Sequence, residues 1–147
     1  MSNQVYSYFM PTVNLMGPGA IKEVGPQAKG LGATKALVVT DVGIRQLGLA
    51  DEVKGLLEAS GIPAIIFDGA QPNPTDLNVE AGLKILKEEK CDIIVSLGGG
   101  SSHDCAKGIG IVAGNGGNIR DYAGINMSTK PMTPLIAINT TAGTASE

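Results

Sequence analysis

Three consecutive glycines, Gly98, Gly99 and Gly100, open the stretch of this sequence whose residue types are best suited to chemistry (98–107, GGGSSHDCAK). Glycines let a backbone approach a ligand closely and adopt positive φ angles. They follow an apolar run and precede a predicted helix, so N–H groups of the turn and of the first helical turn would point at one spot. This arrangement predicts a site for a phosphate or pyrophosphate. The structural alternative is a tight strand–helix turn with a serine cap.

Two serines, Ser101 and Ser102, follow the glycines, and either could cap the helix or donate to a phosphate oxygen. The motif differs from the Rossmann fingerprint, because the G-x-G-x-x-G spacing is absent and the glycines follow the third predicted strand. It also differs from a Walker A loop, because no Gly-Lys-Ser/Thr closes it. The residues alone therefore indicate a phosphate-bearing ligand on an α/β fold of another kind.

Other residues near predicted strand ends and helix starts have two readings each. Asp41 follows the first predicted strand and could bind a ribose diol or cap a helix. Asp104 and Lys107 are three residues apart on a predicted helix and could line a cofactor groove or form a surface ion pair. His103 is the only histidine, and we interpret it as a polar residue at a helix start rather than a metal ligand.

A threonine-rich segment follows the last predicted strand. Thr140, Thr141 and Thr144, with Gly143 among them, offer hydroxyl groups on a flexible backbone. Alone this is a weak signal. In a doubly wound sheet, however, ligands bind beyond the carboxyl ends of the strands. We therefore expect this segment to face the glycine turn.

Alternating strands and helices must position these residues. We predict apolar strands over 35–40, 63–67, 92–97 and 135–139. Helical spacing predicts helices over 20–31, 43–59, from Thr75 or Asp76 to about Lys90, and over 102–112. Gly61 is the expected glycine after the second helix. Residues 1–17 are expected to be extended, and 114–134 to be a loop with one helical turn at 119–122. This βαβ alternation predicts a parallel sheet covered on both faces.

The composition excludes several classes of protein. With 147 residues, 43% of them hydrophobic, and a net charge of −3, the chain can bury a core and is not expected to be disordered. It has neither a basic patch for nucleic acid nor the run of about 20 apolar residues that a membrane span needs. Cys91 and Cys105 are expected to be buried thiols. Because the start MSNQVYSYFMPTV does not look like a secretory leader, we expect a cytoplasmic protein.

Four motifs occur here in a recognised order and spacing: VTD at 39–41, PNPT at 72–75, GGGSxxDxxK at 98–107 and NTTAGTASE at 139–147. Together they resemble the iron-containing (group III) alcohol dehydrogenases over essentially the whole chain. Within that family the sequence looks most like the branch of NAD-dependent methanol dehydrogenases and 1,3-propanediol dehydrogenases. FMPTVNLMGPGAIKEVG at 9–25, SSHD at 101–104 and the segment from Pro134 to Glu147 carry this finer likeness.

The resemblance implies a fold and a set of cofactor residues. It implies that residues 1–147 are the Rossmann-like, NAD-binding N-terminal domain of the dehydroquinate synthase-like/iron alcohol dehydrogenase fold. That domain would be cut at Glu147, before its own end and before a helical metal domain. The residues that match the family's cofactor-binding positions are Asp41, Asn73, Gly99, Gly100, Ser101, Asp104, Lys107, Thr140, Thr141 and Thr144. Ala145 stands where many relatives have glycine.

The resemblance also implies an activity. It implies an NAD-dependent dehydrogenase that interconverts a primary alcohol or diol and an aldehyde, with iron or another divalent metal acting as a Lewis acid. The family's metal ligands, one Asp and three His, have no counterpart in this chain. A small alcohol or aldehyde substrate and a homo-oligomer are expected. The alternatives are a relative of glycerol dehydrogenase or dehydroquinate synthase, against which the NTTAGTASE string argues, and a nucleotide-binding domain without chemistry.

Overall fold

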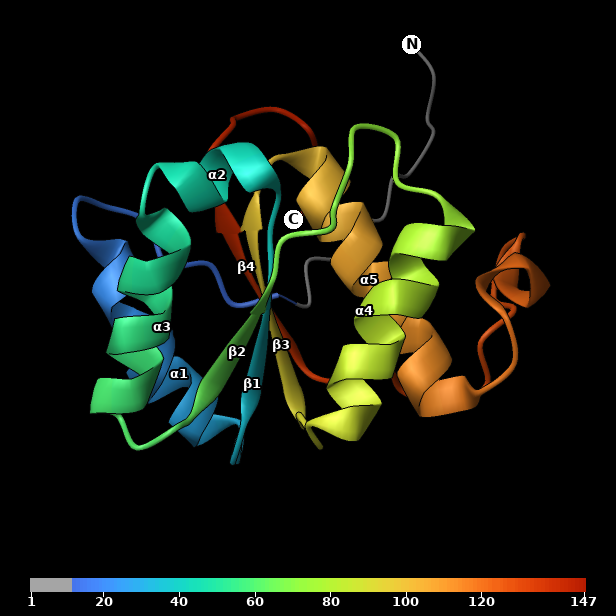
Figure 1. Cartoon of the computed structure of the whole chain (residues 1–147), viewed down its shortest axis with the longest axis horizontal. Helices are drawn as coiled ribbons and strands as arrows, with labels where there is room; N and C mark the ends of the chain where they lie inside the picture. The colour runs from blue at the N-terminus through green and yellow to red at the C-terminus, as the bar shows by residue number, and fades with distance from the viewer. Residues whose placement is uncertain (1–11) are drawn as a thin grey trace, which may run out of the picture.

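A four-stranded parallel sheet forms the centre of the molecule, as predicted (Figure 1). The computed structural model describes residues 12–147. Most of residues 1–17, which were expected to be extended, and of the start MSNQVYSYFMPTV, which does not look like a secretory leader, therefore lies outside the described residues. The strands are β1 (Ala36–Val39), β2 (Ala64–Phe67), β3 (Ile93–Gly98) and β4 (Leu135–Asn139). Their order in the sheet is β2-β1-β3-β4, and all three neighbouring pairs are parallel.

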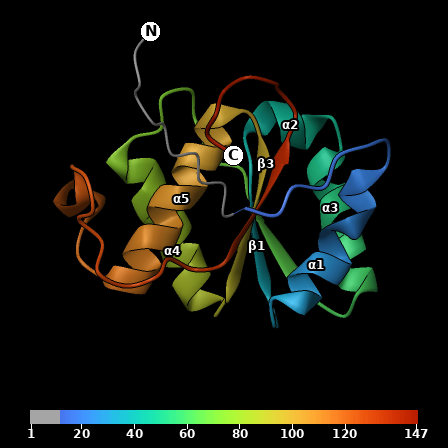
Figure 2. The same cartoon turned by 180° about the vertical axis from the view of Figure 1, so that it is seen from behind.

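Helices cover both faces of the sheet. The 3-10 helix η1 (Ala20–Glu23), α1 (Val24–Gly30) and α3 (Leu49–Ala59) lie on one face, and α4 (Asp76–Glu88) and α5 (Gly100–Asn115) lie on the other. The short α2 (Val42–Gln46) lies at the carboxyl end of the strands, and η2 (Ile119–Tyr122) lies beyond α5. Figure 2 shows the same layers from behind. The predicted helical turn at 119–122 is confirmed.

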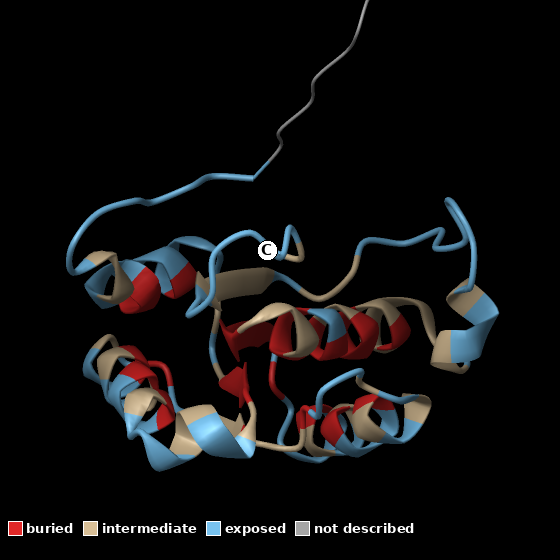
Figure 3. Cartoon of the chain, turned by 90° about the horizontal axis from the view of Figure 1, so that it is seen from above, coloured by how far each residue is buried: buried red, intermediate tan, exposed pale blue. Residues whose placement is uncertain are grey.

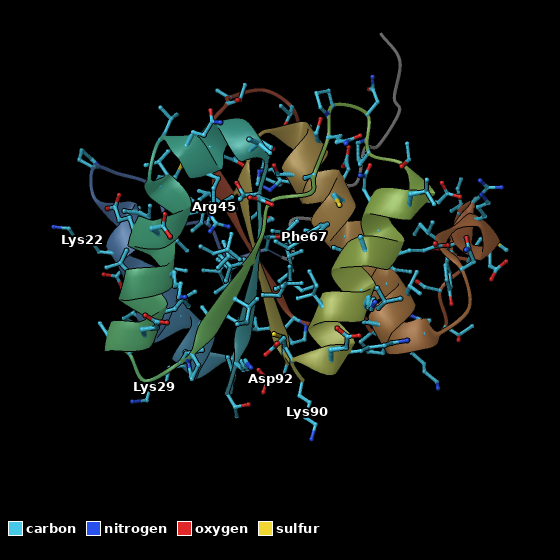
Figure 4. All side chains as sticks on the ribbon, in the orientation of Figure 1. Lys22, Lys29, Arg45, Phe67, Lys90 and Asp92 are labelled. Carbon is cyan, nitrogen blue, oxygen red and sulfur yellow. The ribbon has the colours of Figure 1, made fainter. Side chains whose placement is uncertain are left out.

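Burial follows from the apolar runs that predicted the strands. Every residue of β1 and β3 is buried, because both strands are central and have helices on each side (Figure 3). Phe67 extends from β2 into the core beneath α4 and α5 (Figure 4). β4, at the edge of the sheet, is only partly buried. Within residues 12–147, no helix has the length and apolar character needed to cross a membrane.

Three predicted helices have different bounds. The helix expected over 20–31 begins as η1 and becomes α1, in which Pro26 occupies the first turn, where a missing N–H is tolerated. The helix expected over 43–59 divides into α2 and α3 at Gly48, whose φ is +79°. Gly61, with φ +81°, follows the cap of α3 as predicted. The helix expected over 102–112 is longer, because α5 begins at Gly100 and ends at Asn115.

Glycines on α5 let neighbouring segments pack against its backbone. A Cβ placed on Gly108 would lie 2.8 Å from Val79 of α4. One on Gly110 would lie 2.8 Å from Met132, and one on Gly114 would collide with the carbonyl oxygen of Pro131. The segment that leads into β4 therefore runs directly over α5. This packing sets the position of β4 relative to the helix that follows the glycine turn.

Candidate functional site

The carboxyl ends of β1 and β3 meet at the point where the chain reverses its direction of winding. From β1 the chain continues to β2 on one side, and from β3 it continues to β4 on the other. Between two such strands the connections diverge and leave a crevice, which is where open α/β sheets bind ligands. Asp41 follows β1 and the glycine turn ends β3, so both lie at this crevice.

The glycine turn leaves the start of α5 open. Gly98 ends β3 with a φ of +145°, a conformation almost restricted to glycine, and Gly99 is the N-cap of α5. No side chain caps this end, so the alternative of a serine cap is wrong. The N–H groups of Ser102 and His103 bond the carbonyl oxygen of Gly99 at 3.1 and 3.2 Å. None of the described hydrogen bonds uses the N–H groups of Gly100 and Ser101, which have no acceptor within a helix.

A cavity of about 570 Å³ lies over this turn. Segments that follow all four strands contribute to its lining, which is the arrangement predicted for the carboxyl edge. Its lining residues are Asp41, Val42, Gly43, Ile44, Ala70, Gln71, Pro72, Gly99, Gly100, Ser101, Ser102, Thr140 and Thr141. Gln71 and Pro72 belong to the loop directly after β2, in which the PNPT motif at 72–75 was singled out, although neither residue was among the expected cofactor-binding residues.

Asp41 both caps a helix and faces the glycine turn. Its Oδ1 accepts a hydrogen bond from the N–H of Ile44 at 2.9 Å, so the alternative reading as an N-cap is confirmed. The hydroxyl of Ser102, itself buried, lies 3.5 Å from Asp41 Oδ2. The preceding residue, Thr40, is fully buried, and its hydroxyl donates to the carbonyl oxygen of Leu97 at 2.8 Å. This hydrogen bond between β1 and β3 fixes Asp41 beside the turn, and no pattern in the sequence indicates it.

The threonine segment lies across the glycine turn. The N–H of Thr140 donates to the carbonyl oxygen of Gly98 at 2.9 Å, which extends the pairing of β3 and β4 by one residue. A Cβ on Gly99 would lie 3.2 Å from the Thr141 hydroxyl, and one on Gly100 would lie 3.3 Å from Cβ of Thr144. Figure 1 shows this segment arching from β4 over the end of the sheet to the start of α5. The predicted approach of these two motifs is confirmed.

Four of the predicted site residues do not line this cavity: Thr144, which lies near Gly100, and Asn73, Asp104 and Lys107. Asn73, at φ +54°, is exposed in the loop after β2. Asp104 and Lys107 line a separate cavity of about 620 Å³ between the start of α4, α5 and η2. They form no ion pair with each other; the ion pair at that cavity joins Asp76 and Arg120. Their expected place beside a cofactor therefore stays a prediction.

His103 lies in the first turns of α5, as predicted, and its side chain is fully buried. Its Nδ1 lies 2.7 Å from the hydroxyl of Ser96 on β3, and burial lowers the pKa of the imidazole. Cys91 and Cys105 are buried free thiols, as expected, and burial raises the pKa of each to about 11. Within residues 12–147, no three histidine, cysteine or acidic side chains gather into a metal cluster.

Fold and crevice together define an α/β protein with a doubly wound parallel sheet and a glycine turn at its switch point. Residues 11–147 match the family "Iron-containing alcohol dehydrogenase", and the chain belongs to that family. The resemblance drawn from the four motifs is thereby confirmed.

Several relatives match nearly the whole of this chain. Alcohol dehydrogenase 4 of Schizosaccharomyces pombe is 55% identical over 97% of this chain and 34% of its own length. The 1,3-propanediol dehydrogenase of Citrobacter freundii is 51% identical over 100% of this chain and 38% of its own length. The NAD-dependent methanol dehydrogenase of Bacillus methanolicus is 50% identical over 96% of this chain and 37% of its own length. The crystal structure of a 1,3-propanediol oxidoreductase superposes with a TM-score of 0.93 at 51% identity, covering 98% of this chain and 38% of that one. The chain thus spans less than two fifths of the length of each of these relatives.

Proposed function

We propose that this chain is the NAD-binding part of an alcohol dehydrogenase that interconverts a primary alcohol or diol and an aldehyde by hydride transfer. The observation that carries the proposal is the open start of α5, which faces Asp41 across the switch-point crevice. The names of the relatives support the reaction class, and one of them is NAD-dependent by name. A sulfoacetaldehyde reductase solved in complex with NAD+ superposes with a TM-score of 0.86 at 28% identity, covering 99% of this chain and 38% of that one.

The residues at the turn fit a pyrophosphate. The N–H groups of Gly100 and Ser101 are available as donors, and the positive end of the α5 dipole lies at the same place. The first turn of α5 contains no acidic residue that would repel an anion. The space over Gly99 and Gly100 is already bounded by Thr141 and Thr144, so any larger residue there would fill the approach to the backbone donors.

Asp41 fits the ribose of the adenosine half. One carboxylate oxygen is held by the α2 N–H group, which leaves acceptor capacity on the other oxygen for ribose hydroxyls. Thr140 and Thr141 line the same cavity and offer hydroxyls to the middle of the dinucleotide. When bound, NAD would supply the hydride acceptor at its nicotinamide ring. The role of this chain is to bind and orient it.

The described residues do not fit a metal centre. His103 is buried against Ser96, and no cluster of three metal-binding side chains exists in residues 12–147. We therefore propose that the iron, or other divalent metal, of this family is held by residues outside this chain. We further propose a small alcohol or aldehyde substrate, a homo-oligomer, no nucleic-acid partner and a cytoplasmic location.

Binding of NADH tests the core of the proposal. The whole protein that contains this chain is titrated with NADH by fluorescence and then assayed for NADH formation with C1–C4 alcohols, diols and glycerol, with and without added iron. We expect saturable NADH binding and turnover of a primary alcohol or a diol. A strong preference for glycerol, or binding without any turnover, would favour the glycerol dehydrogenase-like or the non-catalytic alternative. No binding of NADH would overturn the proposal.

A further inference from the structure

A small polar group interrupts the otherwise apolar face of the sheet that packs against α4 and α5. On this face β1 and β3 present Leu37, Val39 and Ile94, which belong to one buried hydrophobic cluster. Side chains alternate along a strand, so Ser96 points to the same face as Ile94. Ser96 is fully buried, and its hydroxyl meets His103 of α5 at 2.7 Å. A buried serine–histidine pair therefore lies directly beneath the glycine turn.

The second ring nitrogen of His103 has no hydrogen-bond partner within the described residues. Nε2 is buried, and the side chain as a whole is 0% exposed. Buried polar atoms are nearly always hydrogen-bonded, because an unpaired one loses its interaction with water and gains nothing in return. The Ser96 contact therefore accounts for the burial of Nδ1 but not for that of Nε2. Burial of Nε2 calls for a hydrogen-bonding partner near it.

Asn139 is the side chain placed to be that partner. It ends β4 on the same face as Leu135, which packs against the cluster around α5. Burial lowers the pKa of His103, and the Asn139 amide raises it, although no hydrogen bond of good geometry satisfies Nε2. The other charged groups that act on the imidazole are Glu147 and Asp104, which raise its pKa, and Lys107, which lowers it.

Asn139 directly precedes the threonine segment, so a contact between Asn139 and His103 would affect where that segment lies. Asn139 pairs with Gly98 across the sheet, and the next residue, Thr140, donates to the Gly98 carbonyl oxygen at 2.9 Å. The threonine segment that crosses the glycine turn therefore begins directly after Asn139. An imidazole that holds Ser96 with one nitrogen and Asn139 with the other would fix the start of that segment relative to α5.

We propose that His103 is a positioning residue of the cofactor site, which acts through the Asn139 side chain to hold the threonine segment over the glycine turn. The inference rests on the proposed function, because it assumes that the crevice binds NAD. His103 is buried and does not line the crevice, so its effect on the cofactor is indirect.

Two substitutions separate the two nitrogens of the ring. Asparagine places a polar atom near Nδ1 and none near Nε2, whereas glutamine reaches the position of Nε2. The Kd for NADH is measured by fluorescence titration of the whole protein that contains this chain, for wild type, His103→Asn, His103→Gln, Asn139→Ala and the double variant His103→Asn/Asn139→Ala. Thermal melting of each variant verifies that it is folded. We expect His103→Asn and Asn139→Ala each to raise Kd at least fivefold, and His103→Gln to stay within twofold of wild type.

The double variant tests whether the two residues act as one unit. We expect it to bind NADH no more weakly than His103→Asn alone, since the same contact is already lost. Independent, multiplying losses would overturn the inference, as would equal losses in His103→Asn and His103→Gln, which would indicate packing alone. If His103→Asn does not fold, Asn139→Ala decides, because Asn139 is exposed; an unchanged Kd there rejects the inference. A wild-type protein that does not bind NADH would instead reject the proposed function.

Discussion

Asp41 and Ser102 are 61 positions apart in the chain, and the Ser102 hydroxyl lies 3.5 Å from Asp41 Oδ2 at the mouth of the crevice. The other carboxylate oxygen accepts from the N–H of Ile44 at 2.9 Å. The carboxylate at the end of β1 is therefore oriented by α2 on one side and by the start of α5 on the other. Its charge faces the cavity in a fixed direction.

That orientation predicts a preference for NAD over NADP. A 2′-phosphate beside Asp41 would place like charges together, at roughly 4 kcal/mol per pair at 4 Å and an effective dielectric constant near 20. Solvent would relieve much of this, and about 2.8 kcal/mol would still give a preference of about a hundredfold. Asp41→Gly should lower the ratio of kcat/KM for NAD to that for NADP.

The control for this prediction uses the helix cap. Asn caps a helix about as well as Asp, so Asp41→Asn should shift the cofactor ratio while retaining the α2 cap. Both variants are assayed with both cofactors in the whole protein. A change of the ratio by less than about threefold, roughly 0.6 kcal/mol, would mean that Asp41 does not face the ribose.

Gly99→Val or Gly100→Val should raise the KM for NAD at least tenfold, equivalent to about 1.4 kcal/mol. The added side chain would enter the space bounded by Thr141 and Thr144 and cover the backbone donors. Gly55→Ala is the matched control, because nothing lies within 4 Å of a Cβ at this position in α3. It should leave KM unchanged and stabilise the fold by about 0.5–1 kcal/mol, since alanine favours a helix interior. Unchanged cofactor kinetics in a folded Val variant would show that the turn is only structural.

Gly98→Ala should reduce the free energy of unfolding by about 2 kcal/mol or more. Gly98 has φ +145°, and a Cβ there would lie 2.5 Å from the Ser102 hydroxyl. Urea denaturation of the single variant and of Gly98→Ala/Ser102→Ala separates the two causes. Removing the hydroxyl should recover only part of the loss, because the backbone strain remains. Full recovery would contradict the assignment of strain to φ.

Asp92 should make the fold sensitive to acid. It lies at the opposite end of the sheet, near Lys90 in Figure 4. Burial raises the pKa of Asp92, but hydrogen bonds from the Thr34 hydroxyl and from the backbone of Thr34 and Lys35 outweigh this and hold it below its usual value.

Because the folded-state pKa is lowered, the ionised carboxylate stabilises the fold above its unfolded pKa, about 3.9, and this contribution is lost as the pH falls through the folded value. Stability measured by denaturation between about pH 5 and pH 2 should therefore decline less steeply in Asp92→Asn than in wild type. If stability declined as steeply in Asp92→Asn as in wild type, Asp92 would not contribute to the loss of stability in acid.

The 147-residue chain alone should not oxidise alcohols, with or without added iron or zinc. Its one histidine is buried against Ser96, and residues 12–147 contain no cluster of three metal-binding side chains. The measurement is NADH formation by the purified chain with C1–C4 alcohols, next to a positive control with a full-length relative. Metal-dependent turnover by the chain would contradict the proposal that the metal is held by residues outside it.

The strands and the glycine turn could be predicted because their signals are local. β1 and β3 are buried on both faces, so they appear in the sequence as continuous apolar runs, and the turn is marked by three glycines. The extent of α5 could not be predicted, because it depends on Gly99 acting as the cap in place of a serine. Whether a helix divides at Gly48 likewise depends on a backbone angle that the residue allows without requiring.

The contacts around the site were beyond the sequence because they join distant positions. Thr40 bonds Leu97, and Ser102 approaches Asp41, across separations of 57 and 61 residues. Helical spacing correctly placed Asp104 and Lys107 near each other, since they line one cavity, but it could not say that this cavity is distinct from the crevice. The rotation of α5 about its axis decides that, and packing against α4 and residues 131–133 sets the rotation.

The glycines that let α5 pack so closely also make it a weak helix by itself. Gly108, Gly110 and Gly114 each disfavour an isolated helix by about 1 kcal/mol relative to alanine, so α5 depends on the sheet for its helicity. The open start of α5 consequently forms only when the whole domain is folded. Binding of any ligand to the glycine turn is therefore linked to global unfolding. At a free ligand concentration of a hundred times its Kd, binding would add about 2.7 kcal/mol to the free energy of unfolding of the whole domain, including strands that the ligand does not contact.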